Sequence, residues 1–161
     1  MTLAESPSLL VAGIGEMVLS SSPHDHLVAY GLGSCIALAV WDPRAKIGGL
    51  AHFMLPSGPA NNGSPVKFID AGIDTFLHAL ESKGAVLTRS TLKAAGAAAM
   101  LTVGSGLAIG KRNAEAMQAA LTERGLNLTA TALGGNTGRT VQLEVADGRF
   151  LIKSLSSVTE L

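Results

Sequence analysis

The chain has 161 residues, enough for one domain to bury roughly two-thirds of its unfolded surface. Its 12 basic and 12 acidic residues cancel and only 4% are aromatic, so composition argues against a nucleic-acid partner or an anionic membrane surface. Its single cysteine excludes an intrachain disulfide and, alone, a thiolate zinc site. We expect one domain over residues 1–161, with its core at about 11–155, and no cofactor.

A cytoplasmic location is expected because one cysteine fits a reducing compartment and the first fifteen residues have no basic segment typical of a secretory signal. Residues 94–110 contain no charge over 17 positions, close to the minimum length of a membrane span. This stretch is built mainly of small residues, which transfer poorly into hydrocarbon. We therefore expect it to form buried strand and turn, without membrane insertion.

The first part of the chain is predicted to be mostly strands, separated by turns at Ser20–Asp25 and from Asp42-Pro43 to Gly48-Gly49. The predicted strands are Val11–Ser20, Leu27–Tyr30, Ile36–Trp41 and Leu50–Leu55. The last two form a strand–turn–strand unit. Pairing across this unit is expected to bring Cys35, at its mouth, close to His52 on the returning strand.

The second part alternates helices and strands after a loop at Pro56–Pro65. Apolar spacing predicts helices over Lys67–Lys83 and Asn113–Arg124, ended by Gly84 and Gly125. The predicted strands are Thr88–Leu92, Met100–Val103, Leu126–Leu133, Thr140–Val145 and Phe150–Leu155. This order of elements predicts an α+β domain in which two helices cover mixed sheets.

Two motifs suggest ligands but have simpler explanations. The glycines of Gly104–Gly110 are spaced one residue too far apart for a dinucleotide loop and lack the lysine context of a P-loop, so a tight turn before the second helix is favoured. His24 and His26 flank Asp25 and could share a face toward a metal. They lie in a turn without a cysteine partner, which favours ordinary exposed histidines.

Cys35 has two interpretations. Free cysteine is among the most buried residue types, and His52 could likewise be a core histidine with its hydrogen bonds satisfied. Alternatively, a thiol that loses its proton to a nearby imidazole is a nucleophile. Gly31 and Gly33 would allow close approach of a ligand, and the backbone amides of Gly33 and Ser34 could support an oxyanion. The spacing of 17 positions alone leaves both interpretations open.

Motifs are spread over most of the chain, at Leu32–Leu38, Asp42, Gly48-Gly49, Ala51–Pro56, Lys67–Ala71, Lys93–Met100, Ile109–Asn113 and Leu133–Arg139. These segments resemble the CheD family of chemoreceptor glutamine deamidases. They follow in the family's order over most of the chain. The resemblance implies a layered α/β/α sandwich of mixed, largely antiparallel sheets with two main helices.

The resemblance also implies a reaction and its partners. Cys35 would be the nucleophile and His52 the general base and acid in hydrolysis of glutamine side-chain amides on chemoreceptor cytoplasmic domains, through a thioester. Methyl-ester hydrolysis is a side activity that the same thioester chemistry would allow. The phosphatase CheC is an expected partner, and a regulatory module that binds CheC or receptors is the alternative function.

One position departs from the family pattern. The family usually has a threonine six positions before the cysteine, which is thought to orient the histidine, and this chain has Ala29 there. Alanine cannot supply that hydrogen bond, so Ser34, Tyr30 or a backbone carbonyl is expected to replace it. If none does, reduced activity is expected, because loss of an orienting group slows catalysis without abolishing it.

Overall fold

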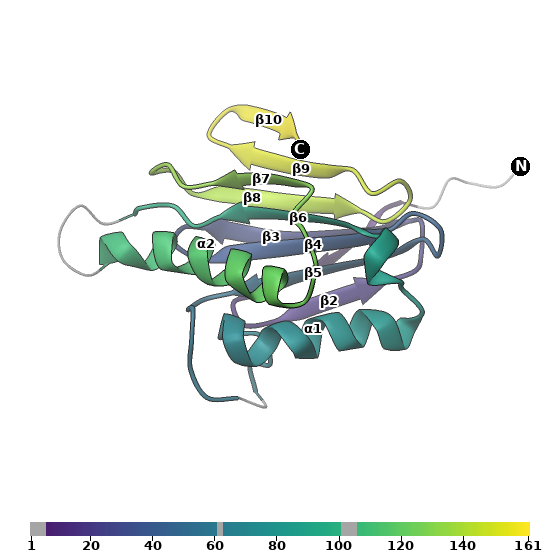
Figure 1. Ribbon diagram of the computed structural model, residues 1–161. Helices are drawn as coiled ribbons and strands as arrows, with labels where there is room; N and C mark the ends of the chain where they lie inside the picture. The colour runs from purple at the N-terminus through teal and green to yellow at the C-terminus, as the bar shows by residue number, and fades with distance from the viewer. Residues whose placement is uncertain (1–5, 61–62, 101–105) are drawn as a thin grey trace, which may run out of the picture.

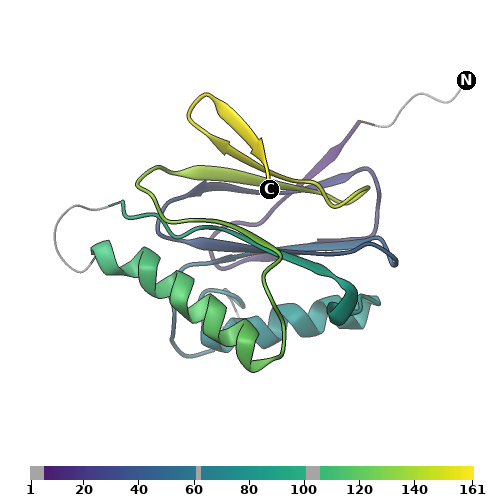
Figure 2. The same cartoon turned by 45° about the horizontal axis from the view of Figure 1, so that its top comes forward.

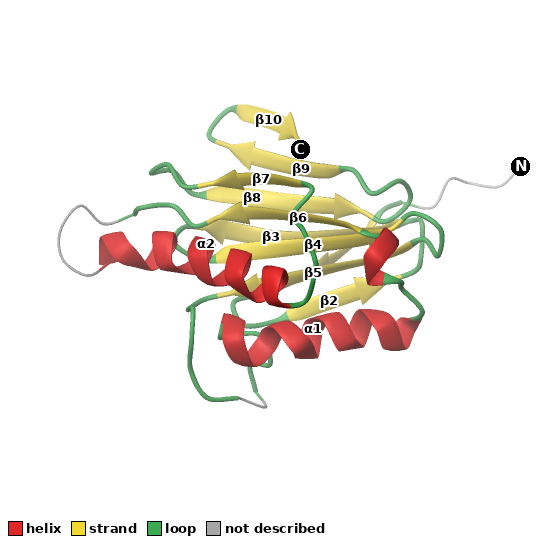
Figure 3. Ribbon diagram, viewed as in Figure 1, coloured by secondary structure: helices red, strands yellow, loops and turns green. Residues whose placement is uncertain are grey.

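The computed structural model describes residues 6–60, 63–100 and 106–161. Its strands form two five-stranded sheets (Figures 1 and 3). The outer sheet contains, in spatial order, β1 (Ser8–Val11), β3 (Asp25–Leu32), β8 (Arg139–Glu144), β9 (Phe150–Ser154) and β10 (Ser157–Glu160). The inner sheet contains β2 (Met17–Ser20), β5 (Ile47–Phe53), β4 (Ile36–Asp42), β6 (Thr91–Gly96) and β7 (Ala130–Leu133). The β1–β3 and β6–β7 pairs are parallel and the others antiparallel.

Two helices, α1 (Ile69–Lys83) and α2 (Gly106–Glu123), lie on one face of the inner sheet, and the outer sheet lies on its other face (Figure 2). The predicted α+β sandwich with mixed, mostly antiparallel sheets and two main helices is confirmed. Both described helices cover the same sheet, so the layers run helices, inner sheet, outer sheet, and this order differs from the α/β/α sandwich that the resemblance implied. None of the described helices is long and apolar enough to cross a membrane.

The core consists of two apolar layers separated by the inner sheet. Ile36, Leu38 and Val40 of β4 pack in the layer with the helices, whereas Ala37 and Ala39 belong to the layer between the sheets. This division follows from the alternation of side chains along a strand. The inner sheet is therefore apolar on both faces, and a polar group on β4 or β5 lies away from bulk water unless it is near the edge.

Two predicted elements in the first part of the chain are wrong. Val11–Ser20 is not one strand, because Gly13 and Gly15 interrupt it and the chain passes from the outer to the inner sheet. Gly48 and Gly49 do not end a turn but lie inside β5. A Cβ at Gly48 would lie 3.2 Å from Leu143, and one at Gly49 would lie 2.8 Å from Leu80, so these glycines let β5 pack closely on both sides.

The second part of the chain agrees better with prediction. Helix α1 ends at Gly84, which has a φ of 113°, as expected of a C-terminal glycine. Helix α2 begins earlier than predicted, so Gly106–Gly110 is helix and not turn. Residues 101–105, including most of the predicted strand Met100–Val103, lie outside the described residues. A short 3₁₀ helix (Leu87–Arg89) occupies part of the predicted strand Thr88–Leu92, and β10 was not predicted.

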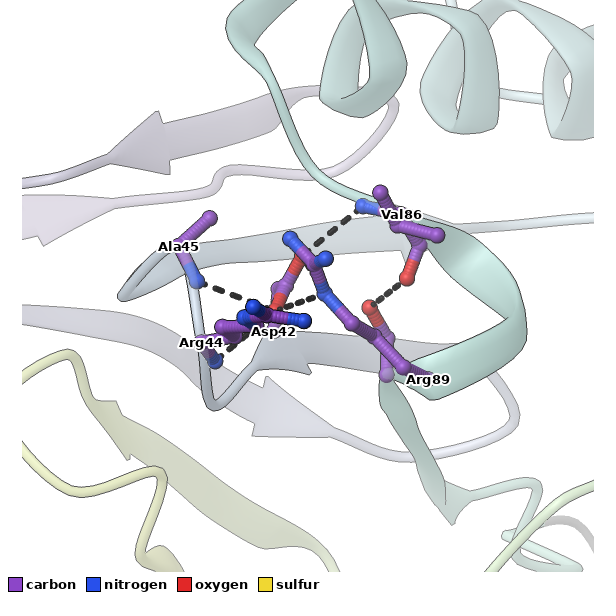
Figure 4. Close-up of polar contacts among 6 residues, drawn as sticks. Asp42, Arg44, Ala45, Val86 and Arg89 are labelled. Atoms are coloured by element: carbon purple, nitrogen blue, oxygen red, sulfur yellow. Dashed lines mark hydrogen bonds and ion pairs between the residues drawn. The ribbon is translucent and has the colours of Figure 1, made fainter.

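A buried ion pair fixes the end of β4 (Figure 4). The Asp42 carboxylate is inaccessible to solvent, accepts hydrogen bonds from the N–H groups of Arg44, Ala45 and Val86, and lies 2.8 Å from the Arg89 guanidinium. Chiefly because of Arg89, the pKa of Asp42 lies well below its usual range. Asp42 is seven residues beyond Cys35 along an extended strand, roughly 23 Å away at about 3.3 Å per residue, so its role is structural.

Candidate active site

The structure places Cys35 and His52 on the same face of the inner sheet. Cys35 immediately precedes β4, and His52 lies on β5 directly opposite Ala37. Because alternate residues of a strand share a face, Cys35, Ala37 and His52 all face the layer between the sheets. Cys35 is half-buried at the edge of that layer, and His52 is only 2% exposed. The predicted strand–turn–strand unit is confirmed as the antiparallel pair of β4 and β5.

The loop between β1 and β2 holds His52 in place. The ring Nδ1 lies 3.1 Å from the carbonyl oxygen of Ala12. The His52 carbonyl accepts a hydrogen bond of 2.8 Å from the N–H of Gly15, and its own N–H donates to the carbonyl of Glu16 at 3.0 Å. A carbonyl oxygen can only accept, so Nδ1 carries the proton in this contact. That leaves Nε2 as the basic nitrogen. It is buried, and none of the described residues, Cys35 included, forms a hydrogen bond with it.

The Ala12 carbonyl supplies the contact expected of the missing threonine. Ala29 is fully buried on β3 and faces the same layer between the sheets. The neighbouring Val28 carbonyl accepts a hydrogen bond of 2.8 Å from the N–H of Ala12, which fixes Ala12 beside β3. Of the three replacements expected from sequence, the structure has the backbone carbonyl. Sequence reasoning could not identify Ala12, because every residue has a carbonyl and its position depends on the fold.

Burial favours the uncharged form of both side chains. It raises the pKa of the Cys35 thiol, although the backbone N–H of Cys35 partly opposes this effect. Burial also lowers the pKa of His52, with smaller opposing contributions from the Ala12 carbonyl and the Glu16 charge. Both shifts disfavour the charged forms. Burial therefore favours the neutral thiol and the neutral imidazole over a thiolate–imidazolium pair.

Gly33 and Ser34 form the turn that leads into Cys35. A Cβ at Gly33 would lie 2.9 Å from the Met100 side chain, so glycine lets this turn pack against Met100. The carbonyls of Gly33 and Cys35 accept hydrogen bonds from the N–H groups of Ala98 and Ala97, at 2.9 and 2.7 Å. Within the described part of the chain, no carbonyl accepts a hydrogen bond from the N–H of Ser34 or Cys35. These two amide donors therefore bind no described carbonyl, and the N–H of Cys35 interacts with its own sulfur.

The other candidate ligands do not gather into a site. His26 lies on β3, where its Nδ1 is 3.2 Å from the side-chain amide of Gln142. Among the residues that the structure describes, no group of three or more histidine, cysteine or acidic side chains is arranged to hold a metal.

The fold is an α+β sandwich, and a thiol and a buried imidazole lie at the ends of two paired strands. A family model described as "CheD chemotactic sensory transduction" matches residues 54–154, a stretch that begins just after His52. The chain belongs to the CheD family.

Relatives resemble nearly the whole chain. "Probable chemoreceptor glutamine deamidase CheD" of Symbiobacterium thermophilum is 40% identical over 153 residues, which cover 91% of this chain and 93% of the relative. "Chemoreceptor glutamine deamidase CheD" of Thermotoga maritima is 36% identical over 151 residues, covering 94% and 95%. A relative from Haloarcula marismortui, also named as a probable chemoreceptor glutamine deamidase, is 37% identical over 154 residues, covering 94% and 88%.

Proposed function

We propose that this protein hydrolyses glutamine side-chain amides on the cytoplasmic domains of chemoreceptors, with Cys35 as nucleophile and His52 as general base and acid. The names of its relatives support the substrate class. One observation carries the assignment of residues: Ala12 binds His52 through Nδ1, which leaves Nε2 on the face of the sheet that Cys35 shares. An imidazole held in this tautomer accepts a proton at Nε2.

The first half of the reaction forms a thioester. His52 Nε2 takes the proton of the Cys35 thiol as the sulfur attacks the amide carbon, and the carbonyl oxygen becomes an oxyanion. The N–H groups of Gly33, Ser34 and Cys35 bind no described carbonyl, and in this proposal those of Ser34 and Cys35 donate hydrogen bonds to the oxyanion. When the carbon–nitrogen bond breaks, the imidazolium returns its proton to the nitrogen, and ammonia leaves.

The second half regenerates the thiol. His52 takes a proton from water, which attacks the thioester carbon, and the carbon–sulfur bond breaks with return of a proton to Cys35. The net change is one glutamine and one water converted to one glutamate and one ammonia. Because burial favours the neutral pair, the charges in this proposal exist only while a substrate occupies the site.

The surroundings of Cys35 suit a protein substrate. Cys35 is partly exposed, and two exposed methionines flank it: Met100, which contacts Gly33, and Met54, which follows the last pair of the β4–β5 ladder. Flexible methionine side chains adapt to apolar surfaces of partners. A glutamine on a receptor surface could therefore reach the sulfur while neighbouring apolar residues contact these methionines.

The test is deamidation of a purified chemoreceptor cytoplasmic fragment, followed by mass spectrometry of its peptides. We expect glutamine-to-glutamate conversion by the wild type, none by Cys35→Ala, and a loss of about 10²- to 10⁴-fold in His52→Gln. His78→Gln, which changes an exposed histidine on α1, is the matched control and should match the wild type. Absence of conversion by the wild type would refute the activity. Undiminished conversion by Cys35→Ala would refute the nucleophile.

A regulatory binding role is the second candidate, and Ala29 is the observation that favours it. If the site were inactive, binding of CheC would be its remaining role. The contact between Ala12 and His52 favours the enzyme instead, because the base is oriented without the threonine. Wild-type protein that retains CheC in a pull-down but converts no glutamine would select the binding role.

A further inference from the structure

Three hydrogen bonds fix the backbone of the turn that precedes Cys35, and one of them comes from a side chain. Main-chain N–H groups bind the carbonyls of Gly33 and Cys35, as described above. The carbonyl of Ser34, between them, accepts a hydrogen bond of 2.8 Å from Nδ2 of Asn113. The orientation of the peptide between Ser34 and Cys35 therefore depends on a residue of α2, 79 positions away in sequence.

That peptide includes the N–H of Cys35. A trans peptide is planar, and its C=O and N–H groups point in opposite directions. The described residues contain no cis peptide bond. When Asn113 draws the Ser34 carbonyl toward α2, the Cys35 N–H must point away from α2. Asn113 thus sets the direction of the Cys35 N–H, which binds no described carbonyl.

Asn113 also reaches the strand that carries His52. The same Nδ2 group donates at 3.0 Å to the carbonyl of Met54, two residues after His52. The β4–β5 ladder ends at the pair Ile36–Phe53, so beyond this point the described strands have no ladder bond between them. Asn113 bridges the two strand ends where the ladder stops, and it holds the segments of Cys35 and His52 at a fixed separation.

The packing of α2 is arranged for this contact. A Cβ at Gly110, one turn before Asn113, would lie 2.6 Å from the carbonyl oxygens of Ala97 and Ala98, so only glycine allows the helix to come this close. Asn113 is fully buried, and within the part of the chain that the structure describes its Oδ1 has no hydrogen-bond partner. A buried polar atom without a partner is unfavourable, and an apolar side chain would avoid it. The amide is thus best explained by its two donated hydrogen bonds.

We propose that Asn113 is a positioning residue of the active site, which orients the Ser34–Cys35 peptide so that the Cys35 N–H stabilises the oxyanion. This inference rests on the proposed thiol chemistry but not on the identity of the protein substrate. It predicts that Asn113 matters for attack on a carbonyl and not for other reactions of the same sulfur.

Two reagents distinguish attack of the Cys35 sulfur on a carbonyl from its other reactions. Iodoacetamide alkylates the thiolate by direct displacement of iodide, without an oxyanion, and reports the accessibility and ionisation of Cys35. p-Nitrophenyl acetate acetylates the same sulfur through a tetrahedral oxyanion and releases p-nitrophenolate. Cys35→Ala gives the background rate for both. The ratio of the acetylation rate to the alkylation rate measures oxyanion stabilisation alone.

In Asn113→Leu we expect this ratio to fall by about 10²-fold, the usual cost of losing one oxyanion donor, with the alkylation rate unchanged. Asn113→Ala removes the N–H donors without adding bulk or charge, and should behave alike if Asn113→Leu does not fold. Gln118→Leu, an exposed amide on the same helix, is the control and should leave both rates unchanged.

An unchanged ratio in a folded variant would overturn the proposal, whether both rates stay the same or fall together. Failure of the proposed function has a different signature. If wild-type protein is acetylated at Cys35 in an Asn113-dependent way but converts no receptor glutamine, the role of Asn113 stands and the substrate assignment is wrong.

Discussion

Replacement of Ala29 by threonine tests whether the Ala12 carbonyl orients His52. Ala29 is fully buried between the sheets, so the added methyl and hydroxyl groups should destabilise the protein by about 1–3 kcal/mol through overpacking. For a domain of this size that corresponds to a decrease in Tm of about 2–12 °C. His52 Nδ1 already has its acceptor at 3.1 Å, so we expect no gain in deamidation rate.

The alternative predicts a very different result. If His52 lacked an orienting partner, restoring one could raise kcat by up to about 10⁴-fold, the effect seen when an orienting group is disabled in a serine protease triad. The assay is the initial rate of glutamine conversion in a saturating receptor fragment. Ala29→Val is the control, because valine matches threonine in shape but has no hydroxyl. A threonine variant at least about tenfold faster than the valine variant would refute the role of Ala12, since this exceeds the packing effect that both share.

Two further predictions concern charge. Asp42→Asn should lower the free energy of unfolding by about 3–5 kcal/mol, because it leaves the buried donors around Asp42 without an anion. The control is Asp74→Asn, which changes the largely exposed pair with Arg124 and should lower the free energy of unfolding by less than about 1 kcal/mol. Because the pKa of Asp42 is depressed, its contribution to the free energy of unfolding is complete above about pH 3.9 and is lost as the pH falls below that value. The stability of Asp42→Asn should therefore fall less steeply in acid than that of the wild type. Equal acid sensitivity of the two proteins would contradict this. In the free protein, the rate of Cys35 alkylation should rise with pH and reach its midpoint above the value of about 8.5 typical of free thiols, since burial raises its pKa. A plateau in the acid range would instead reveal a resting thiolate–imidazolium pair.

The location of the proposed catalytic pair could be predicted because it depends on local structure. A strand, a turn and a returning strand place Cys35 and His52 on paired strand ends, and the turn residues and apolar runs are visible in sequence. The same patterns located α1 and most of the strands. Gly48 and Gly49 are typical turn residues in sequence. Their place inside a strand depends on close packing against Leu143 and Leu80, which come from distant parts of the chain.

The groups that support the pair could not be predicted, for two different reasons. The Ala12 carbonyl carries no side-chain signal, and its segment was expected to be the middle of a single strand. Asn113 did carry a signal that was missed. It is a polar residue on the apolar side of α2, four positions before the buried Met117, but the helix was expected to begin at Asn113 itself. A polar side chain at the start of a helix is ordinary. A buried polar side chain in the second turn of a helix instead indicates a specific hydrogen-bond partner.

The contact between Ala12 and His52 has a consequence for when the protein becomes reactive. The two residues are 40 positions apart, and Ala12 reaches His52 only where the chain passes from the outer to the inner sheet. A hairpin of β4 and β5 that has formed early in folding would carry the thiol and the imidazole but no acceptor to fix the ring. The proposed chemistry therefore requires that the two sheets have docked, because only then does the His52 ring have its fixed acceptor.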